Sequence, residues 1–377
     1  MLNEIGSHFE YDDTYIRDTN EKNNDWLPKM QDASFTFSGR SAIDLVLNDI
    51  SETKRVKSVY IPAYCCSSMI EPFLKKNINV FFYNVRFVAG KGIIYDYNPK
   101  VECDIFFAMS YFGLEEFNCD NLIEEINNQS TIVIEDITHR LLCDISYSTK
   151  TDYTIASLRK WFGIPTGGYA TKKNGTFKNK PFKCSEEFIH NKIKAMQEKY
   201  QYVKGQGIDK NEFMDKFNSY EQTLKDIDWS YEIDSTSFNC IQRVNIESIR
   251  KSRRSNAEIL YAKINELEYI KPLIPKPDLG GKCPLFVPVM VSGNKRDGLR
   301  NFLIQNNVYC PVHWPAEGII DSDIWKHELS LICDQRYSST DMHRIINLMK
   351  QWESKIAINY RDNIKDHYNI SKVSEEL

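Results

Sequence analysis

Lys160 is the residue of this sequence whose surroundings best prepare an amine for chemistry. It stands in the segment Asp152-YTIASLRKWFGIPTGGYA, among apolar, aromatic and glycine positions. We expect this setting to remove water from the amine, which lowers its pKa and lets it form a Schiff base with a carbonyl compound. A surface lysine beside a hairpin turn has the same pattern, and this residue alone does not separate the two interpretations.

Two acids end an apolar run at Thr131-IVIEDITH, where His139 follows three positions after Asp136. The carboxyl ends of strands in an open α/β sheet face the ligand crevice. Asp136 is therefore placed to hold a cationic ring nitrogen such as a pyridinium. The competing interpretation is that Asp136 caps the next element and that His139 is a core or rim histidine.

A third group, Ser38-Gly39-Arg40-Ser41, lies between an extended stretch and an amphipathic helical pattern. A glycine turn that opens a helix exposes unpaired backbone N–H groups. With the Arg40 side chain and the Ser41 hydroxyl, these groups predict a seat for a phosphate. An ordinary helix N-cap has the same sequence.

Alternating strand and helix patterns must position these groups. Candidate strands lie at 58–61, 80–85, 104–109, 131–134 and 153–158, which predicts a mostly parallel sheet covered by helices. The charged region 173–232 predicts helices and loops around the mouth of the site. A long helical pattern at 235–267 then connects to a smaller C-terminal part with a strand at 286–291, a helix at 295–306 and a last helix from residue 340.

Composition excludes several classes of protein. The 377 residues are 42% hydrophobic and carry a net charge of −4, with no long basic tract, so we expect no nucleic-acid partner. The basic cluster Arg250-KSRR is interpreted as a solvated helix face. No apolar stretch is long enough to span a bilayer. Ten cysteines without metal-like spacing or a secretory segment indicate reduced thiols in the cytoplasm and no metal site.

The ordered motifs resemble the DegT/DnrJ/StrS family of sugar aminotransferases, from about Phe35 to about Met349. They are SGRSAI from Ser38, YIPAYCCSSMIEPF from Tyr60, IEDITH from Ile134, SLRKWFGIPTGG from Ser157, VYCPVHWP from Val308 and LICDQRYSSTDM from Leu331. The resemblance implies the α/β, three-layer type I fold of pyridoxal phosphate enzymes. We expect a polar N-terminal arm or a loosely ordered lead-in at 1–34, a large cofactor-binding domain at 35–255 and a small α/β domain at 256–377.

The resemblance also implies roles for single residues. Lys160 matches the lysine that binds pyridoxal phosphate covalently and then shuttles a proton. Asp136 matches the acid that pairs with the pyridine nitrogen, and His139 falls near the ring oxygen of the cofactor. Tyr64 matches a residue that stacks on the pyridine ring, with a core tyrosine as the alternative. The phosphate is received by backbone amides at the start of a helix, those of Gly39, Arg40 and Ser41.

Some positions depart from the family pattern. Many members have a phosphate-binding serine five positions before the lysine, where this chain has Ile155, and Ser157 is the candidate substitute. Pro165 and Thr166 replace the usual acid ahead of the glycine pair. The fold and cofactor are therefore expected to carry over better than the substrate. Arg159, beside Lys160, is expected to face away from the cofactor, toward an acid or a subunit contact.

The implied activity is transfer of an amino group from an amino acid, usually glutamate, to a keto group of a nucleotide-linked sugar. His313, Trp314 and Arg336 either line the acceptor pocket or fix the domain joint. Family members form dimers with shared active sites, which predicts a homodimer. Relatives that remove a sugar hydroxyl have histidine in place of Lys160, which argues against dehydration. Two alternatives stay open: an enzyme of this fold acting on a small amino or keto acid, and a non-catalytic binding protein.

Overall fold

The computed structural model describes residues 4–11, 26–27, 32–88, 91–114, 119–126, 130–144, 150–184, 186–226, 231–275, 277–315 and 324–373. An eight-stranded sheet lies at its centre, with the strand order β2-β9-β8-β7-β6-β3-β4-β5. The strands are β2 Asp32–Thr36, β3 Ser58–Pro62, β4 Asn79–Val88, β5 Gly92–Asp96, β6 Ile105–Met109, β7 Ile132–Asp136, β8 Tyr153–Ser157 and β9 Gly168–Lys172. The run β8-β7-β6-β3-β4 is parallel, with antiparallel pairs at both ends. This confirms the predicted mostly parallel sheet.

The middle strands are apolar because helices and loops cover both faces of the sheet. β6 has the sequence Ile-Phe-Phe-Ala-Met and is buried throughout, as expected for a strand covered on both faces. β7 begins with apolar residues and ends in Glu135 and Asp136, both buried. Glu135 is neutralised by an ion pair with the buried Arg140. Because the parallel strands end at one edge of the sheet, Asp136 shares that edge with the residues that follow β3, β6 and β8.

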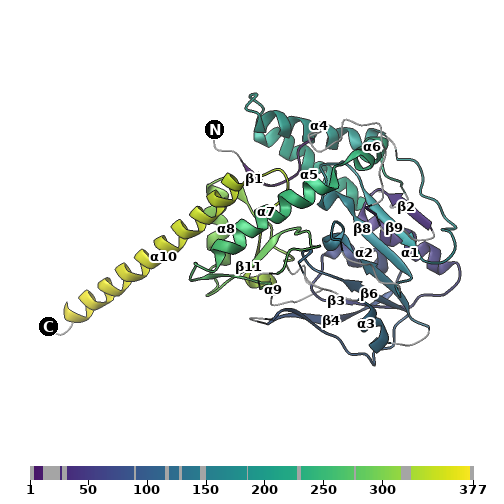
Figure 1. Ribbon diagram of the computed structural model, residues 1–377, viewed down its shortest axis with the longest axis horizontal. Coiled ribbons are helices and arrows are strands. Elements are labelled where there is room, and N and C mark those ends of the chain that lie inside the picture. The colour runs from purple at the N-terminus through teal and green to yellow at the C-terminus, as the bar shows by residue number, and fades with distance from the viewer. Residues whose placement is uncertain are drawn as a thin grey trace.

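Helices connect the strands and pack on the sheet (Figure 1). α1 (Gly39–Ser51) contacts β8 and β9, and α2 (Ser67–Lys75) contacts α1 and β4. α3 (Cys119–Ile126) precedes β7 in the chain. Beyond β9, α4 (Glu186–Val203) and α5 (Lys210–Asp226) pack against each other, which confirms helices in the region 173–232.

The C-terminal part holds a separate antiparallel sheet of β10 (Ile270–Pro272), β11 (Val287–Val291) and β13 (Glu328–Leu331). α8 (Arg296–Gln305) contacts β13, and α7 (Ile246–Ile264) contacts β10 and β11. α10 (Ser339–Val373) packs on α7 and α8. The predicted strand at 286–291 and the helices from 295 and 340 are confirmed. The final helix α10 extends away from the rest of the molecule (Figure 1).

The predicted single helix at 235–267 is wrong, because the chain forms α6 (Ser235–Arg243) and α7 (Ile246–Ile264) instead. Val244 has an extended backbone with ψ 139°, which ends α6. Asn245 then caps α7, since its side-chain oxygen accepts the N–H of Ser248 at 3.2 Å. α7 passes without a break through residue 255, the predicted domain boundary, and the division into domains stays a prediction.

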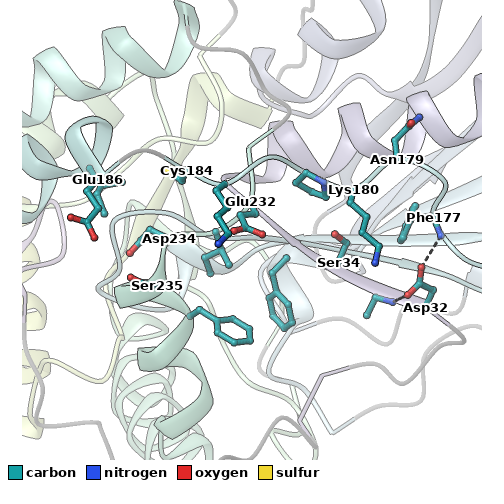
Figure 2. A pocket seen from close by; sticks show the side chains of 17 residues that line it. Asp32, Ser34, Phe177, Asn179, Lys180, Cys184, Glu186, Glu232, Asp234 and Ser235 are labelled. Atoms are coloured by element: carbon teal, nitrogen blue, oxygen red, sulfur yellow. Dashed lines mark hydrogen bonds between the residues drawn. The ribbon is translucent and has the colours of Figure 1, made fainter.

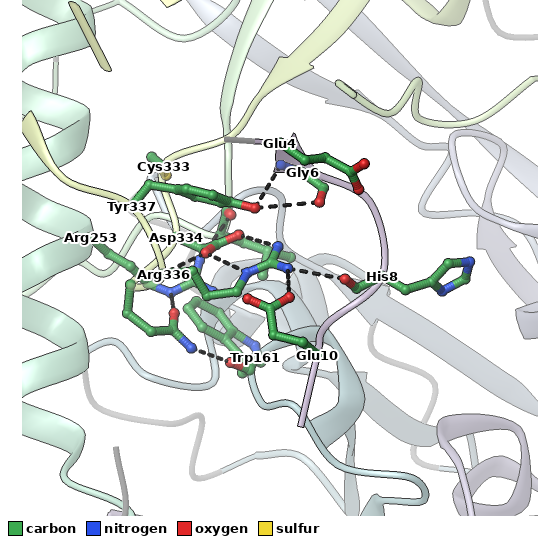
Figure 3. A network of polar contacts seen from close by, with 12 residues as sticks. Glu4, Gly6, His8, Glu10, Trp161, Arg253, Cys333, Asp334, Arg336 and Tyr337 are labelled. Atoms are coloured by element: carbon green, nitrogen blue, oxygen red, sulfur yellow. Dashed lines mark hydrogen bonds and ion pairs between the residues drawn. The ribbon is translucent and has the colours of Figure 1, made fainter. Parts of the chain in front are cut away.

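The first described residues are docked onto the C-terminal part. β1 (Ile5–Gly6) pairs in parallel with β12 (Val308–Tyr309), and Ile5 is fully buried. The Tyr337 hydroxyl accepts the Gly6 N–H at 2.7 Å (Figure 3). A loosely ordered lead-in is therefore wrong for residues 4–11, and the N-terminal arm stays a prediction. Most of its remaining length, 12–25 and 28–31, lies outside the described residues.

Two further sequence expectations concern helices and thiols. Within the ranges given above, no helix is long and apolar enough to cross a membrane. The nine cysteines whose side chains are described are free thiols, including the neighbours Cys65 and Cys66.

Candidate active site

Asp136 ends β7 in an almost fully buried position. Its Oδ1 accepts the backbone N–H of Thr138 at 2.8 Å. Burial raises the pKa of Asp136 to about 6, while the hydrogen bonds from Thr138 and the charge of Lys160 act in the opposite direction. A carboxylate in such a place gains most from a cationic partner, because a nearby positive charge restores its ionised form.

Thr138 connects this strand end to the next one, a role that the sequence reasoning missed. It begins the 3-10 helix Thr138–Arg140, and its hydroxyl accepts the backbone N–H of Ser157 at 2.9 Å. Its carbonyl oxygen accepts the indole N–H of Trp161 at 2.6 Å. Thr138 therefore fixes the loop after β7 to both sides of Lys160. The IEDITH pattern includes this threonine, but it gives no sign of these partners.

Lys160 lies in the 3-10 helix Leu158–Lys160, directly after β8. Its side chain is exposed, so the expectation that it is buried and desolvated is wrong. The apolar neighbours explain the error, because Leu158 and Trp161 turn inward while Lys160 points into a cavity of about 620 Å³. The charge of Lys160 nevertheless contributes to the pKa shifts of Asp136, His139 and His313, so it lies near all three groups.

An aromatic cluster covers the strand ends. The His139 ring stacks on Trp314 with centroids 5.5 Å apart, and Tyr64 meets Trp314 edge-on at 4.9 Å and Tyr111 at 5.1 Å. The side chains of Tyr64 and Tyr111 are fully buried. The structure thus brings together Tyr64, His139 and Trp314, three residues that the sequence placed in the site separately.

His139 is held as a neutral imidazole. Burial lowers its pKa well below the ordinary value, and the charges of His313 and Lys160 act in the same direction. Its Nδ1 accepts the backbone N–H of Phe112 at 3.1 Å, which assigns the proton to Nε2. His139 can therefore donate one hydrogen bond from Nε2.

The start of α1 is an N-cap that also packs on β8. The Ser38 hydroxyl accepts the backbone N–H of Ser41 at 3.2 Å, so Ser41 has the ordinary capping partner. A Cβ placed on Gly39 would lie 3.1 Å from the Ser157 Cβ, which shows how closely the helix start approaches Ser157. The Arg40 side chain points elsewhere, since its Nε lies 2.7 Å from Glu71. Only the backbone of Arg40 is left for the predicted phosphate seat.

His313 is buried and is held by hydrogen bonds with Ser330 and Glu328. Its Nδ1 lies 2.8 Å from the Ser330 hydroxyl, and Glu328 accepts its backbone N–H at 2.7 Å. Glu328 is fully buried, and burial raises its pKa to about 8. His313 and Trp314 thus face the cluster at the strand ends and are also fixed to β13.

Arg336 has partners within the chain (Figure 3). Its guanidinium contacts Asp334 at 2.8 Å and Glu10 at 3.1 Å, and it donates to the His8 carbonyl at 3.1 Å. These contacts fasten residues 4–11 to the C-terminal part. The Arg336 side chain also lines the cavity of Lys160, and both alternatives for Arg336, the acceptor pocket and the domain joint, stay predictions.

The sequence predicts specific surroundings for two basic residues near the site. Arg159 meets an acid, as expected, because its guanidinium lies 3.6 Å from Glu221. It lines the same cavity as Lys160, and its orientation relative to the cofactor stays a prediction. The expectation of a solvated helix face is wrong. Arg253, in the cluster interpreted as solvated, is 1% exposed. It lies over the Trp161 ring at 4.6 Å and bonds the Gln335 side chain at 2.8 Å, and Gln335 bonds the Trp161 carbonyl at 2.8 Å. This contact ties the residue after Lys160 to α7.

A second cavity, of about 810 Å³, lies beside the edge strand β2 (Figure 2). Lys180, Glu232 and Asp234 contribute charges of both signs to its wall. None of the residues predicted for the site lines it. We therefore place the candidate site at the cavity that contains Lys160 and Ser157, although it is the smaller of the two.

The fold is that of the sugar aminotransferases, the aspartate aminotransferase type that the sequence predicted. Spr1654 from Streptococcus pneumoniae, described as a sugar aminotransferase and solved in a PLP form, is similar over 91% of this chain and 93% of its own, with 14% identity and a TM-score of 0.59. DesV from S. venezuelae, solved with a ketimine intermediate, is 12% identical over 85% of this chain and 84% of its own, with a TM-score of 0.56.

DesI, solved in the presence of its TDP-sugar product, is 12% identical over 88% of this chain and 83% of its own, with a TM-score of 0.57. No family model matches the chain, and no curated protein matches it. At these identities, the likeness establishes the fold.

Proposed function

We propose that this chain is a pyridoxal phosphate-dependent aminotransferase that transfers an amino group from L-glutamate to a keto group of a nucleotide-linked sugar. The proposal rests on one placement: Lys160 lies in the turn after β8, near Asp136 at the end of the neighbouring strand β7. This placement occurs in a chain with the fold of sugar aminotransferases. When bound, pyridoxal phosphate supplies an electron sink for the carbon that carries the amino group.

The residues at the strand ends fit this cofactor. Asp136 is buried, so water does not solvate its carboxylate. A cationic ring N–H would stabilise the ionised form in place of water. Gly39 and Ser157, both predicted to contact the phosphate, lie so close that a Cβ on Gly39 would be 3.1 Å from the Ser157 Cβ. The Tyr64 hydroxyl and the Ser110 hydroxyl are buried and have no hydrogen-bond partner among the described residues. Such unsatisfied groups are costly unless a ligand or water completes them.

Each side chain then has a defined task. Lys160 would hold the cofactor and move a proton with its amine, which is exposed and lines the cavity. Asp136 would hold the positive ring nitrogen, and His139 would donate from Nε2 to the ring oxygen. Tyr64 would cover the ring, while Ser157 and the backbone at Gly39, Arg40 and Ser41 would hold the phosphate. Trp161, through its bond to Thr138, keeps Lys160 in place.

Borohydride trapping tests the attachment point. We expect the purified protein to be yellow with pyridoxal phosphate, and reduction should leave the cofactor mass on the peptide that contains Lys160. Lys160→Ala should stay colourless, and Lys178→Ala, a change at an exposed lysine, should behave as the unmodified protein. An adduct on another residue, or none at all, would contradict the proposal.

The substrate class needs a separate assay. We expect glutamate to yield 2-oxoglutarate when a keto sugar nucleotide is supplied, and a panel of such sugars identifies the acceptor. Turnover with free keto acids alone would instead assign the chain to enzymes of small amino or keto acids. A protein that binds no cofactor would be a non-catalytic member of the fold.

The active unit is proposed to be a homodimer in which each site includes partner residues. Light scattering after size exclusion measures this directly. A mass equal to the 44.1 kDa of one chain would exclude it.

A further inference from the structure

The cavity that contains Lys160 is rich in positive charge. Among its described lining residues are six cations and two carboxylates: Arg159, Lys160, Lys192, Arg253, Arg300 and Arg336, with Glu221 and Asp334. Part of this charge is already matched. Arg336 forms ion pairs with Asp334 and Glu10, and Arg253 donates to backbone carbonyls and Gln335. Arg300 donates to the Cys310 carbonyl, and the three remaining cations, Arg159, Lys160 and Lys192, act on Glu221 at the other wall.

Glu221 is shared between two cations at that wall. Its Oε1 lies 3.6 Å from the Arg159 guanidinium and 3.6 Å from the Lys192 ammonium. Burial acts to raise the pKa of Glu221, but the charges of Arg159, Lys192, His8 and Lys160 outweigh it and hold the pKa below its usual value. One carboxylate thus faces three lysine and arginine side chains.

Lys192 is unusual for a charged residue because its side chain is only 8% exposed. Its Nζ lies over the rings of Phe217 and Tyr220, 4.6 and 4.8 Å from their centroids. Burial, with the charge of Arg159, lowers its pKa to about 8. A buried ammonium with one long ion pair is poorly compensated and gains from a second anion.

Arg159 is also incompletely satisfied. Its Nε is buried and has no hydrogen-bond partner in the part of the chain that the structure describes. The nearest carboxylate oxygen is too distant for a short charge-assisted bond, since such bonds measure about 2.7–2.9 Å. The Glu221 side chain is 47% exposed, so it is free to move aside when another anion approaches.

We propose that Arg159 and Lys192 form an oxyanion-binding subsite in which Glu221 acts as a displaceable counter-ion. The ligand is a doubly charged oxyanion carried by a substrate, either the diphosphate of the sugar nucleotide or the carboxylates of the amino donor. His8 completes the wall, because its ring stacks on Phe217 with centroids 4.3 Å apart. This inference rests on the proposed function for the identity of the ligand, but not for the subsite itself.

Calorimetric titration tests the subsite without catalysis. Inorganic pyrophosphate and glutarate serve as probes for the two sources, and the protein is saturated with pyridoxal phosphate so that the phosphate seat is filled. At pH 7 and low salt, Lys192→Met should raise the Kd of the bound probe about tenfold or more, as expected for loss of a charge-assisted contact. Lys192→Arg should keep most of the affinity.

Two further variants separate a lost contact from a damaged fold. Glu221→Gln should tighten binding by roughly fivefold, because it removes the competing counter-ion. A general loss of structure cannot produce that gain. Lys194→Met, an exposed lysine on the same helix α4, should leave the Kd unchanged. Pyrophosphate binding that depends on Lys192 assigns the subsite to the acceptor, and glutarate binding assigns it to the donor.

Other results overturn the subsite. These are the absence of binding by both probes, an unchanged Kd in Lys192→Met, and weaker binding in Glu221→Gln. The cofactor absorbance of each variant is recorded in parallel. Normal absorbance with no oxyanion binding refutes the subsite alone, while oxyanion binding without cofactor absorbance refutes the proposed function alone.

Discussion

Gly168 begins β9 at the point where this strand passes the start of α1. A Cβ at this position would lie 2.0 Å from the Ser38 carbonyl oxygen and 2.4 Å from the Thr36 hydroxyl oxygen. Normal contact between such atoms needs about 3.5 Å, so Gly168→Ala must move the backbone by more than about 1 Å. Because Ser38 caps α1, this shift also disturbs the helix start that is proposed to hold the cofactor phosphate.

Overpacking of this kind costs about 3 kcal/mol, since backbone rather than a flexible side chain must give way. For 377 residues the unfolding entropy is about 0.8 kcal/mol/K, so the thermal midpoint should fall by about 4 °C. Thermal unfolding gives the midpoint, and a titration with pyridoxal phosphate should reveal weaker binding.

Gly298→Ala is the matched control for this substitution. In α8 the new Cβ would meet nothing closer than 3.9 Å, so the midpoint should rise by about 1 °C. A Gly168→Ala protein with the original midpoint and the original cofactor affinity would refute the reasoning about this close approach.

Three more outcomes are expected. Burial raises the pKa of Glu328 from 4.5 to about 8, so protonation of this side chain stabilises the fold fully below pH 4.5. This contribution is lost as the pH rises through about 8. The thermal midpoint should therefore fall across this window, and less in Glu328→Gln. Parallel pH curves would contradict this. Arg253→Met removes the guanidinium donor from two buried carbonyls, those of Leu285 and Pro284, and leaves the Pro284 oxygen only the weak Cys333 thiol contact. It should cost about 2 kcal/mol or more in a denaturant titration, which an unchanged transition would disprove. Tyr337→Phe removes the bond to the Gly6 N–H, so amide exchange in residues 4–11 should quicken about fivefold, and equal exchange rates would exclude this anchor.

Local patterns were sufficient for the middle strands of the large sheet and for the helices from 295 and 340. The apolar run before Glu135 and Asp136 predicted β7, and parallel pairing then placed Asp136 at the ligand edge of the sheet. The same reasoning failed at Val244, where one extended residue divides a helical pattern in two. Periodicity continues across such a break, because both helices present an apolar face to the same core.

Lys160 marks the limit of reasoning from neighbours in the sequence. Its apolar flanks predicted burial, but Leu158 and Trp161 turn inward in this 3-10 turn while the amine stays exposed. The buried, poorly compensated amine of this cavity is Lys192 instead, which comes from an ordinary charged helix pattern. No local signal distinguished it from its exposed neighbours.

By itself, the sequence determined the five middle strands of the large sheet, the type of fold through its ordered motifs, and which acid, histidine and lysine are candidates for the site. These depend on periodicity and on motifs that are contiguous in the chain. Only the tertiary structure decided which charges pair, as for Arg336 and Glu10, which are 326 positions apart. The physical reason is that burial and ion pairing depend on the distance between atoms, which the spacing of residues along the chain does not fix.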